Sequence, residues 1–235
     1  MASFFAGAAV RFAAFETSTE WCSVALWHEG EIAAIERRTD NRHAELALPM
    51  LERLLANAGI GPAALDAIAF GAGPGAFTGL RIACGLAQGL ALARDVPVIG
   101  VSTLEAMAED SGAARVVACL DARMHEVYYS AYERNGARWR ELIAAVCIAP
   151  AAVERPPGEG WIGCGNGFGV YREALNEALG DALAATRPAA HPGATAVARL
   201  AAPRLAAGGG VDAALAQPIY VRDKVALTTE ERLHR

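Results

Sequence analysis

The chain has 235 residues, of which 54% are hydrophobic and 20% are charged, which is enough for one large domain or for two lobes with buried cores. Its formal net charge is −5 and its 21 basic residues are scattered along the sequence. Electrostatic binding of nucleic acid requires clustered Lys and Arg side chains. This composition therefore argues against a protein that binds nucleic acid mainly by charge. If the protein acts on RNA, something else should hold most of that RNA.

The sequence predicts a cytoplasmic protein without a membrane anchor. The five cysteines lie in apolar runs without CxxC spacing, which is typical of reduced core thiols. The longest apolar helix expected, Ile82–Ala93, is too short to span a bilayer. Residues 1–10 are apolar but lack the basic start of a secretory signal, and we expect the first of them to be frayed.

The first half of the chain, residues 1–110, is expected to form one α/β lobe. A turn at His28–Gly30 joins two of its strands as a hairpin. Asp40 or Asn41 marks a helix start, and Gly59 marks the end of that helix. In chain order the elements are strands Val10–Phe15, Cys22–Trp27 and Glu31–Arg37, helix His43–Ala58, strand Ala67–Gly71, helix Gly79–Ala93 and strand Val96–Val101.

The second half, residues 111–235, repeats this order and is expected to form a second lobe. Both halves begin with three strands and then alternate helices with strands, which indicates duplicated α/β lobes facing each other across a cleft. The elements are strands Arg115–Asp121, Val127–Glu133, Trp139–Val146 and Trp161–Ile162, helices Val170–Leu179 and Thr195–Ala207, and an extended tail, Pro218–Arg222. Gly180–Pro192 and Gly208–Gly210 are expected to be loops, and the chain beyond Leu227 is expected to be disordered.

The most informative segment is the glycine-rich turn Gly73–Gly79, between a buried strand and an apolar helix. Its glycines and proline favour a tight backbone path, and Thr78 is placed to cap the first helical N–H groups. Backbone donors at such a helix start converge on an anion or on a partner's backbone. No Gly-Lys-Ser/Thr follows, so this is not the phosphate loop of nucleoside triphosphatases.

The two helices of the first half carry more apolar surface than one sheet face can bury. Gly85 and Gly89 are four residues apart and allow another helix to come close. Core packing accounts for about half of each helix, and the surplus favours a protein–protein interface. The residues expected to bind a partner are His43, Leu46, Ala47, Met50, Leu51, Leu54, Arg81, Ala83, Ala87 and Leu90.

A corner of hydroxyl residues after the first strand is the main candidate for chemistry. A carboxylate followed by hydroxyls resembles the first phosphate loop of the actin, Hsp70 and sugar-kinase superfamily, although an ordinary Ser/Thr turn has the same composition. Asp121 stands where the second phosphate loop would begin, but the side chains of Ala122–His125 would occupy the space of the phosphates. The candidates for a vestigial phosphate loop are Glu16, Thr17, Ser18, Thr19, Gly73, Gly75 and Thr78.

No metal site or nucleophilic triad is predicted. His43 begins a helix, but the residue four positions later is Ala47 rather than a second histidine, and the remaining histidines share no ligand-like spacing. Ser18, Ser102 and His125 have nothing in their spacing that indicates a catalytic arrangement.

Taken together, the motifs resemble the bacterial TsaB (YeaZ) family from about Phe12 to Leu227. The family usually has Ser at the position of Ala76 and often has Asp at the position of Glu16. The motifs that carry the resemblance are Glu16–Thr19, Cys22–Trp27, His43, Gly73–Ile82, Gly100–Leu104, Asp121–Met124, Glu126–Tyr128 and Pro218–Arg222.

The resemblance implies an actin-like fold and a role in making threonylcarbamoyladenosine beside the anticodon of tRNAs that read codons starting with A. It implies a non-catalytic subunit that binds and activates the paralogous transferase TsaD through the helices of the first lobe. The ATPase TsaE is expected to dock on that pair, tRNA to be reached through the complex, and ATP or ADP and Mg²⁺ to be needed by the partner subunits. No tightly bound cofactor is expected, and the sequence leaves open whether the isolated chain forms a homodimer through the same surface, the arrangement expected in a crystal.

A second hypothesis is an enzyme in its own right, either an actin-like ATPase or kinase or a glycoprotease-like peptidase. The side chains after Asp121 and the lack of paired metal-binding histidines weigh against it. Binding and turnover of Mg-ATP by the isolated chain would distinguish the two hypotheses.

Overall fold

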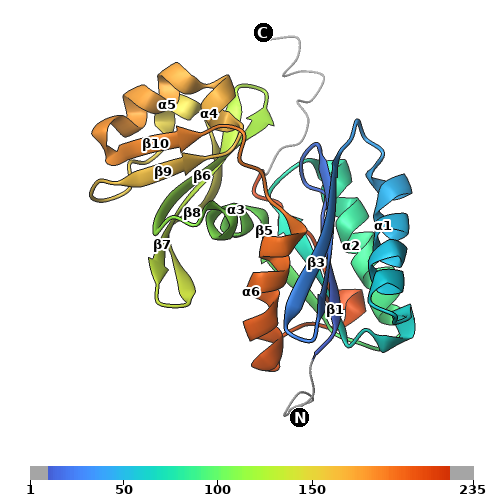
Figure 1. Cartoon of the computed structure of the whole chain (residues 1–235). Helices are drawn as coiled ribbons and strands as arrows, with labels where there is room; N and C mark the ends of the chain where they lie inside the picture. Colours follow the sequence, from blue (N-terminus) through green and yellow to red (C-terminus); the bar gives the residue numbers. More distant parts are fainter. Residues whose placement is uncertain (1–9, 223–235) are drawn as a thin grey trace.

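The structure, a computed structural model, describes residues 10–222, and the predictions for the residues before Val10 and beyond Leu227 lie outside this range. The chain forms two lobes, each built around a five-stranded mixed sheet with helices on its faces (Figure 1). The predicted α/β class and the two-lobed arrangement are confirmed.

The first sheet has the order β3-β2-β1-β4-β5. Its central strand β1 is fully buried, pairs antiparallel with β2 and pairs parallel with β4. A turn ending in Gly30, whose φ is 82°, closes the predicted hairpin between β2 and β3. The strands are β1 (Phe12–Glu16), β2 (Trp21–His28), β3 (Glu31–Arg38), β4 (Ala67–Gly73) and β5 (Val98–Ser102).

Helices α1 (His43–Asn57) and α2 (Phe77–Leu92) cover one face of this sheet. Helix α1 buries one face against β2 and β3. Pro49 lies inside this helix, which continues past it to Asn57. Gly59 follows with a φ of 67°, the left-handed conformation that ends a helix. Both helices are confirmed close to their predicted bounds.

The second sheet has the order β10-β9-β6-β7-β8, which reproduces the connectivity of the first sheet strand for strand. In both sheets the first three strands are antiparallel, and the last two strands pair parallel. The predicted duplication is therefore visible in the topology. The elements are β6 (Arg115–Arg123), β7 (Glu126–Asn135), β8 (Arg138–Ile148), β9 (Trp161–Cys164), α4 (Gly167–Val170), α5 (Arg172–Leu179) and β10 (Leu183–Arg187).

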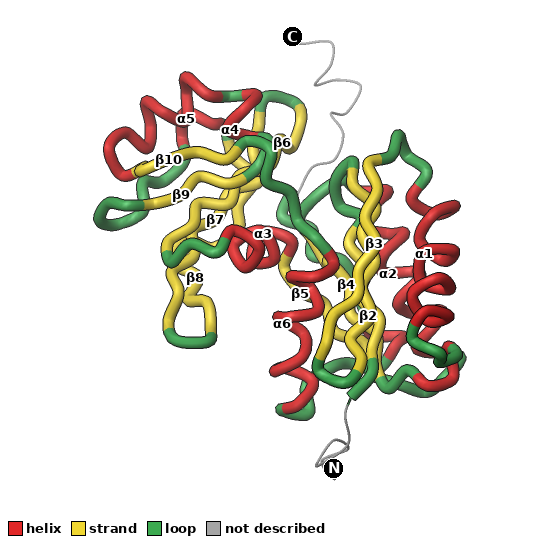
Figure 2. Tube along the Cα trace, viewed as in Figure 1, coloured by secondary structure: helices red, strands yellow, loops and turns green. Residues whose placement is uncertain are grey.

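Helix α3 (Thr103–Ser111) was not predicted, and it lies between the two sheets (Figure 2). The Ser102 hydroxyl accepts a hydrogen bond from the backbone N–H of Glu105 at 3.3 Å, and Gly112 ends the helix with a φ of 67°. Serine followed three residues later by glutamate is the sequence signature of a helix start, so a signal was available. The helix contacts α6 as well as β6 and β7, and so joins the lobes.

Strand β10 lies in Gly180–Pro192, which was predicted to be a loop. The prediction was wrong because β10 is an edge strand whose residues are mostly exposed, so it shows no alternation of apolar and polar residues. The helix predicted over Val170–Leu179 starts earlier and is divided into α4 and α5 at Tyr171.

The C-terminal helix α6 (Ala194–Ala206) belongs to the first lobe, so the predicted division into 1–110 and 111–235 is wrong. Its side chains pack against the face of the first sheet opposite α1 and α2, among Phe12, Ala69 and Ile99. In Figure 1 this helix, which is coloured as C-terminal, stands beside the N-terminal strands. The first sheet thus buries its second face with a helix that is distant in sequence.

All five cysteines are free and four of them are buried, as predicted for core thiols. Within residues 10–222, none of the helices combines the length and the apolar character needed to cross a membrane.

The placement of α6 makes Leu205 part of the first-lobe core, where it is fully buried. We expect Leu205→Ala to lower the free energy of unfolding by about 2–5 kcal/mol because it leaves a cavity. Leu215→Ala is the matched control, since Leu215 is 64% exposed and its truncation should cost less than about 0.5 kcal/mol. Urea unfolding followed by circular dichroism would measure both, and equal effects would contradict this assignment of α6.

Candidate functional site

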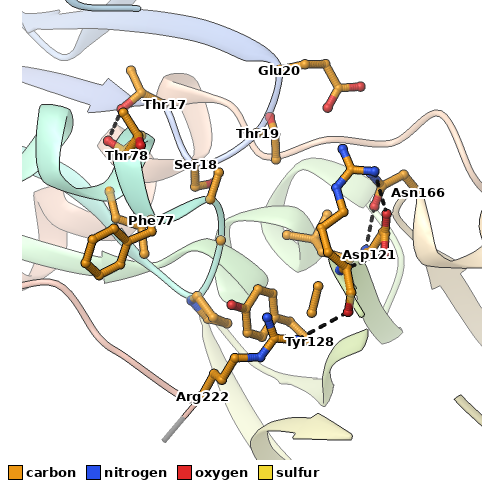
Figure 3. A pocket seen from close by; sticks show the side chains of 18 of the residues that line it. Thr17, Ser18, Thr19, Glu20, Phe77, Thr78, Asp121, Tyr128, Asn166 and Arg222 are labelled. Atoms are coloured by element: carbon orange, nitrogen blue, oxygen red, sulfur yellow. Dashed lines mark hydrogen bonds and ion pairs between the residues drawn. The ribbon is translucent and has the colours of Figure 1, made fainter. Parts of the chain in front are cut away.

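A cavity of about 530 Å³ lies between the lobes. It is lined by the corner after β1, the connection from β3 to α1, the start of α2, the turn between β6 and β7, the start of α4 at Asn166, and the tail up to Arg222. Figure 3 shows Thr17, Ser18 and Thr19 on the first-lobe side of this cavity, with Asp121 and Asn166 on the second-lobe side. It is the cleft that the duplicated lobes were predicted to form.

The glycine-rich turn is packed directly onto the corner after β1. The backbone N–H of Ala76 donates to the Ser18 carbonyl at 2.7 Å, and the Thr17 hydroxyl donates to the Gly79 carbonyl at 2.7 Å. A Cβ atom at Gly79 would lie 1.8 Å from the Thr17 carbonyl oxygen, and one at Gly75 would lie 2.6 Å from the Ser18 Cβ. Glycine is therefore required here by the close approach of two backbone segments.

Thr78 does not cap α2, contrary to the prediction. The helix begins one residue earlier, at Phe77, and no side chain caps it at Ala76. The first turn is instead closed against the corner, because the Ala76 N–H bonds to Ser18. Backbone donors at this end of α2 are thus partly used by the chain itself.

Glu16 does not face the cavity. Its carboxylate is fully buried behind Gly71, where an added Cβ would lie 1.8 Å from Oε2. One oxygen accepts from the Ser18 N–H at 2.7 Å, and the other accepts from the Thr103 hydroxyl at 3.3 Å. Burial raises the pKa of this carboxyl, and the bonds from Ser18 and Thr103 oppose that rise only in part.

The second-lobe loop presents side chains where a glycine loop would present backbone. Asp121 lines the cavity, and its carboxylate accepts hydrogen bonds from the Arg123 N–H at 2.9 Å and from the Tyr171 hydroxyl at 3.1 Å. Arg123, Met124 and His125 all have φ values between 55° and 62°, in the left-handed region that favours glycine. Of these side chains, Arg123 and Met124 line the cavity, on the side where the second phosphate loop had been expected.

The tail, which sequence reasoning had not assigned to the site, forms one edge of the cavity. The Ile219 N–H donates to the Ala72 carbonyl at 2.7 Å, which holds the tail against the end of β4. The Tyr220 ring lies 5.4 Å from the Phe77 ring, and the Arg81 guanidinium lies 3.7 Å above the Phe77 ring. Nothing in the extended pattern of the tail indicated where it would lie.

Arg222 ends the described part of the tail and crosses to the second lobe. Its guanidinium pairs with the Glu126 carboxylate at 2.5 Å and donates to the Arg123 carbonyl at 3.3 Å. The tail thereby connects the two sides of the cleft.

The structure brings five of the seven phosphate-loop candidates to this cavity and leaves Glu16 and Gly73 outside it. Gly73 instead lies against the tail, where an added Cβ would be 2.8 Å from the Ile219 carbonyl oxygen. The five that line the cavity are Thr17, Ser18, Thr19, Gly75 and Thr78.

Most of the residues predicted to bind a partner are buried in the protein's own first lobe. This placement corrects the choice of residues: the first-lobe sheet and the contact between α1 and α2 absorb the apolar surface that had been counted as surplus. Leu46 and Leu90 are partly buried, and Arg81 is exposed but engaged with Phe77. The buried residues are His43, Ala47, Met50, Leu51, Leu54, Ala83 and Ala87.

The outer face of α2 is nevertheless open and poor in side chains. Gly85 and Gly89 are exposed, and a Cβ atom added to either would meet nothing within 4 Å. Leu92, one turn further along the helix, is 74% exposed. Another helix could therefore approach the backbone of α2 closely at these two glycines.

Histidines do not assemble a metal site in the part of the chain that the structure describes. No three His, Cys, Asp or Glu side chains of residues 10–222 converge as ligands for an ion. The His43 ring bonds through Nε2 to the Thr19 carbonyl at 2.9 Å, and so ties α1 to the corner after β1.

The two glycine environments of α2 give a matched pair of substitutions. Gly79→Ala forces a methyl group onto the Thr17 carbonyl and should lower the free energy of unfolding by at least about 2 kcal/mol. Gly85→Ala adds the same methyl group in open space and should raise it by about 0.5–1 kcal/mol through helix propensity. Chemical denaturation measures both, and a tolerated Gly79→Ala would contradict the close packing.

The buried carboxyl of Glu16 makes stability depend on pH. Because its pKa is raised above the ordinary carboxyl value of 4.5, the bound proton stabilises the fold fully at low pH, and this contribution is lost as pH rises through the raised value. Glu16→Gln removes the titration, so its melting temperature relative to the wild type should increase between pH 5 and pH 8. A difference that stays constant over this pH range would contradict the raised pKa of Glu16.

Comparison with known proteins agrees with this architecture. The family model described as "TsaD: tRNA N6-adenosine threonylcarbamoyltransferase" matches residues 35–229. The tRNA threonylcarbamoyladenosine biosynthesis protein TsaB of Haemophilus influenzae is 38% identical over 225 residues, which cover 90% of this chain and 93% of that protein. The TsaB protein of Escherichia coli is 37% identical over 231 residues, covering 92% and 96%.

A solved structure shows the same fold. YeaZ from Pseudomonas aeruginosa superposes with a TM-score of 0.84 at 40% identity, covering 90% of this chain and 99% of that one. A second structure, of a Pseudomonas aeruginosa protein described as similar to peptidase YeaZ, has the same TM-score of 0.84 and covers 91% of this chain. The matches extend over both lobes, and the chain therefore belongs to the TsaB (YeaZ) family, whose curated members are named for the biosynthesis of threonylcarbamoyladenosine in tRNA.

Proposed function

We propose that this chain is a non-catalytic subunit that binds a TsaD transferase and supports its active conformation. In this role it serves the transfer of a threonylcarbamoyl group to the adenosine beside the anticodon of tRNAs that read codons starting with A. Family membership supports the pathway, since the relatives are named for it. The complex would act in the cytoplasm, with tRNA reached through the assembled subunits.

The observation that carries the non-catalytic part is the state of the two carboxylates at the starts of the two expected phosphate loops, Glu16 and Asp121. Glu16 is sealed behind Gly71 and bonded to Ser18 and Thr103. Asp121 is held by Tyr171 and by the backbone of its own loop. A carboxylate that orients a metal-bound water or takes a proton must reach the reacting atoms, and both of these are engaged by the protein itself.

The open face of α2 supports the partner part of the proposal. Gly85 and Gly89 expose helix backbone over one turn, and Leu92 adds an exposed apolar side chain next to them. We propose that a helix of TsaD packs here. Binding can favour the active conformation of TsaD only if this face of α2 makes different contacts with the active and the inactive conformation. The ATPase TsaE would then dock on the pair, and the partner subunits would supply the ATP and Mg²⁺ chemistry. In the absence of TsaD, a second copy of this chain could occupy the same face.

The test is reconstitution of tRNA modification with TsaD, TsaE and the threonylcarbamoyl-AMP synthase of the same organism. We expect Gly89→Arg to weaken the complex with TsaD by at least about tenfold, since the new side chain keeps a partner helix away from the backbone. Modification, measured by mass spectrometry of digested tRNA, should fall in parallel. Circular dichroism should remain unchanged, because the substituted position faces open space.

The matched control is Asn176→Arg, which adds the same side chain to the exposed face of α5 in the second lobe. It should leave both the complex and the modification unchanged. Undiminished binding of TsaD to Gly89→Arg would reject this face of α2. Turnover of Mg-ATP or cleavage of a peptide by the isolated chain would instead favour the free-standing ATPase, kinase or peptidase.

A further inference from the structure

The connector from β10 to α6, residues 188–193, carries the chain from the second lobe back to the first. Figure 2 shows it as a loop running from β10 to the start of α6. The other covalent crossing is the short link between α3 and β6. Within residues 10–222 the connector is therefore one of two covalent links that set how the lobes sit relative to each other.

One side chain, His191, attaches the middle of this connector to the first sheet. Its Nε2 lies 2.8 Å from Oε1 of Glu36 on β3. Its ring stacks on the Trp21 ring of β2, with 4.2 Å between centroids and an interplanar angle of 6°. Three residues further along, at the start of α6, the Ala194 N–H donates to the Ser23 hydroxyl at 2.9 Å.

The His191 ring borders a second cavity, of about 440 Å³, whose lining includes charged side chains from β3, α3 and β10. Asp110 at the end of α3 adds a second carboxylate to that of Glu36, and Arg199 of α6 lies 3.5 Å from Asp110. Arg187 of β10 donates to the Ser111 carbonyl at 2.6 Å. The imidazole thus faces two carboxylates, while each arginine is directed to another partner.

These surroundings favour the imidazolium. The pair with Glu36 raises the pKa of His191, and Asp110 adds to the rise, while the same pair lowers the pKa of Glu36. Burial raises the pKa of Asp110 to about 6, against the pull of Arg199. The stabilisation from His191 is full below the ordinary histidine value of 6.5 and is lost as pH rises through its raised value. The Glu36 contribution is lost only as pH falls through its lowered value, below the ordinary 4.5.

We propose that His191 is a proton-dependent latch between the lobes: the protonated ring clamps the connector onto β2 and β3, and loss of the proton releases it. The charged ring donates a charge-assisted hydrogen bond to Glu36, which is stronger than the bond a neutral ring would make. Released, the connector restrains the second lobe less, so the lobes move more freely at alkaline pH than near pH 6.

Hydrogen exchange of the full chain tests this latch, with each variant compared with the wild type at the same pH so that the intrinsic rates cancel. His191→Gln should speed exchange of the backbone amides of Ala190 and Ala194 about fivefold at pH 6, the size expected for a partly exposed ion pair. At pH 9 the ratio of the exchange rates of the variant and the wild type should approach one. His125→Gln, in the exposed turn between β6 and β7, should give a ratio of one at both pH values.

A second readout separates the latch from mere packing. In a nuclear magnetic resonance titration, the pKa of the His191 ring should lie above the ordinary histidine value and should fall in Glu36→Gln, which keeps the shape of the side chain. An equal exchange ratio at pH 6 and pH 9 would mean that only the stacking on Trp21 holds the connector. That result, or an unshifted pKa in the wild type, would overturn the proposal.

Discussion

The arrangement of the first lobe depends on one close backbone contact. The turn at the start of α2 lies against the corner after β1 with no room for a side chain at Gly75 or Gly79. This contact holds the start of α2 against the corner, whose residues Thr17, Ser18 and Thr19 line the cleft. In a protein interior packed to crystal-like density, such a contact has few alternatives. The same contact uses polar groups of the backbone that would otherwise face a ligand.

Local patterns in the sequence were sufficient for most of the fold. Buried strands are apolar runs bounded by turns, and their repeated order in the two halves predicted two equivalent sheets, which the topology confirms. Helix α3 was missed although Ser102 and Glu105 mark its start, because its short length leaves few apolar repeats. The location of α6 could not be predicted, since an apolar helix face fits either sheet equally well.

The site was predictable in position but less so in detail. The corner after β1 and the Asp121 loop do face each other across a cavity, as the duplication required. A helical wheel, however, shows which residues are apolar without showing what covers them, so Met50 and Leu54 were assigned to a partner although the lobe's own core contains them. The open stretch of α2 around Gly85 and Gly89 is open because glycine has no side chain. A search for apolar side chains does not detect such a stretch.

The return of α6 to the first sheet has a consequence for biosynthesis. Strand β5 ends at Ser102 and α6 begins at Ala194, so the ribosome must add about 90 residues before the second face of that sheet can be covered. At bacterial rates of about 5–20 residues per second, this interval lasts on the order of 5–20 s. During this interval the N-terminal strands expose an apolar surface that α6 will later cover. Exposed apolar segments of nascent chains are the kind that chaperones recognise. The first lobe, although synthesised first, therefore completes its folding only after the second lobe has been synthesised.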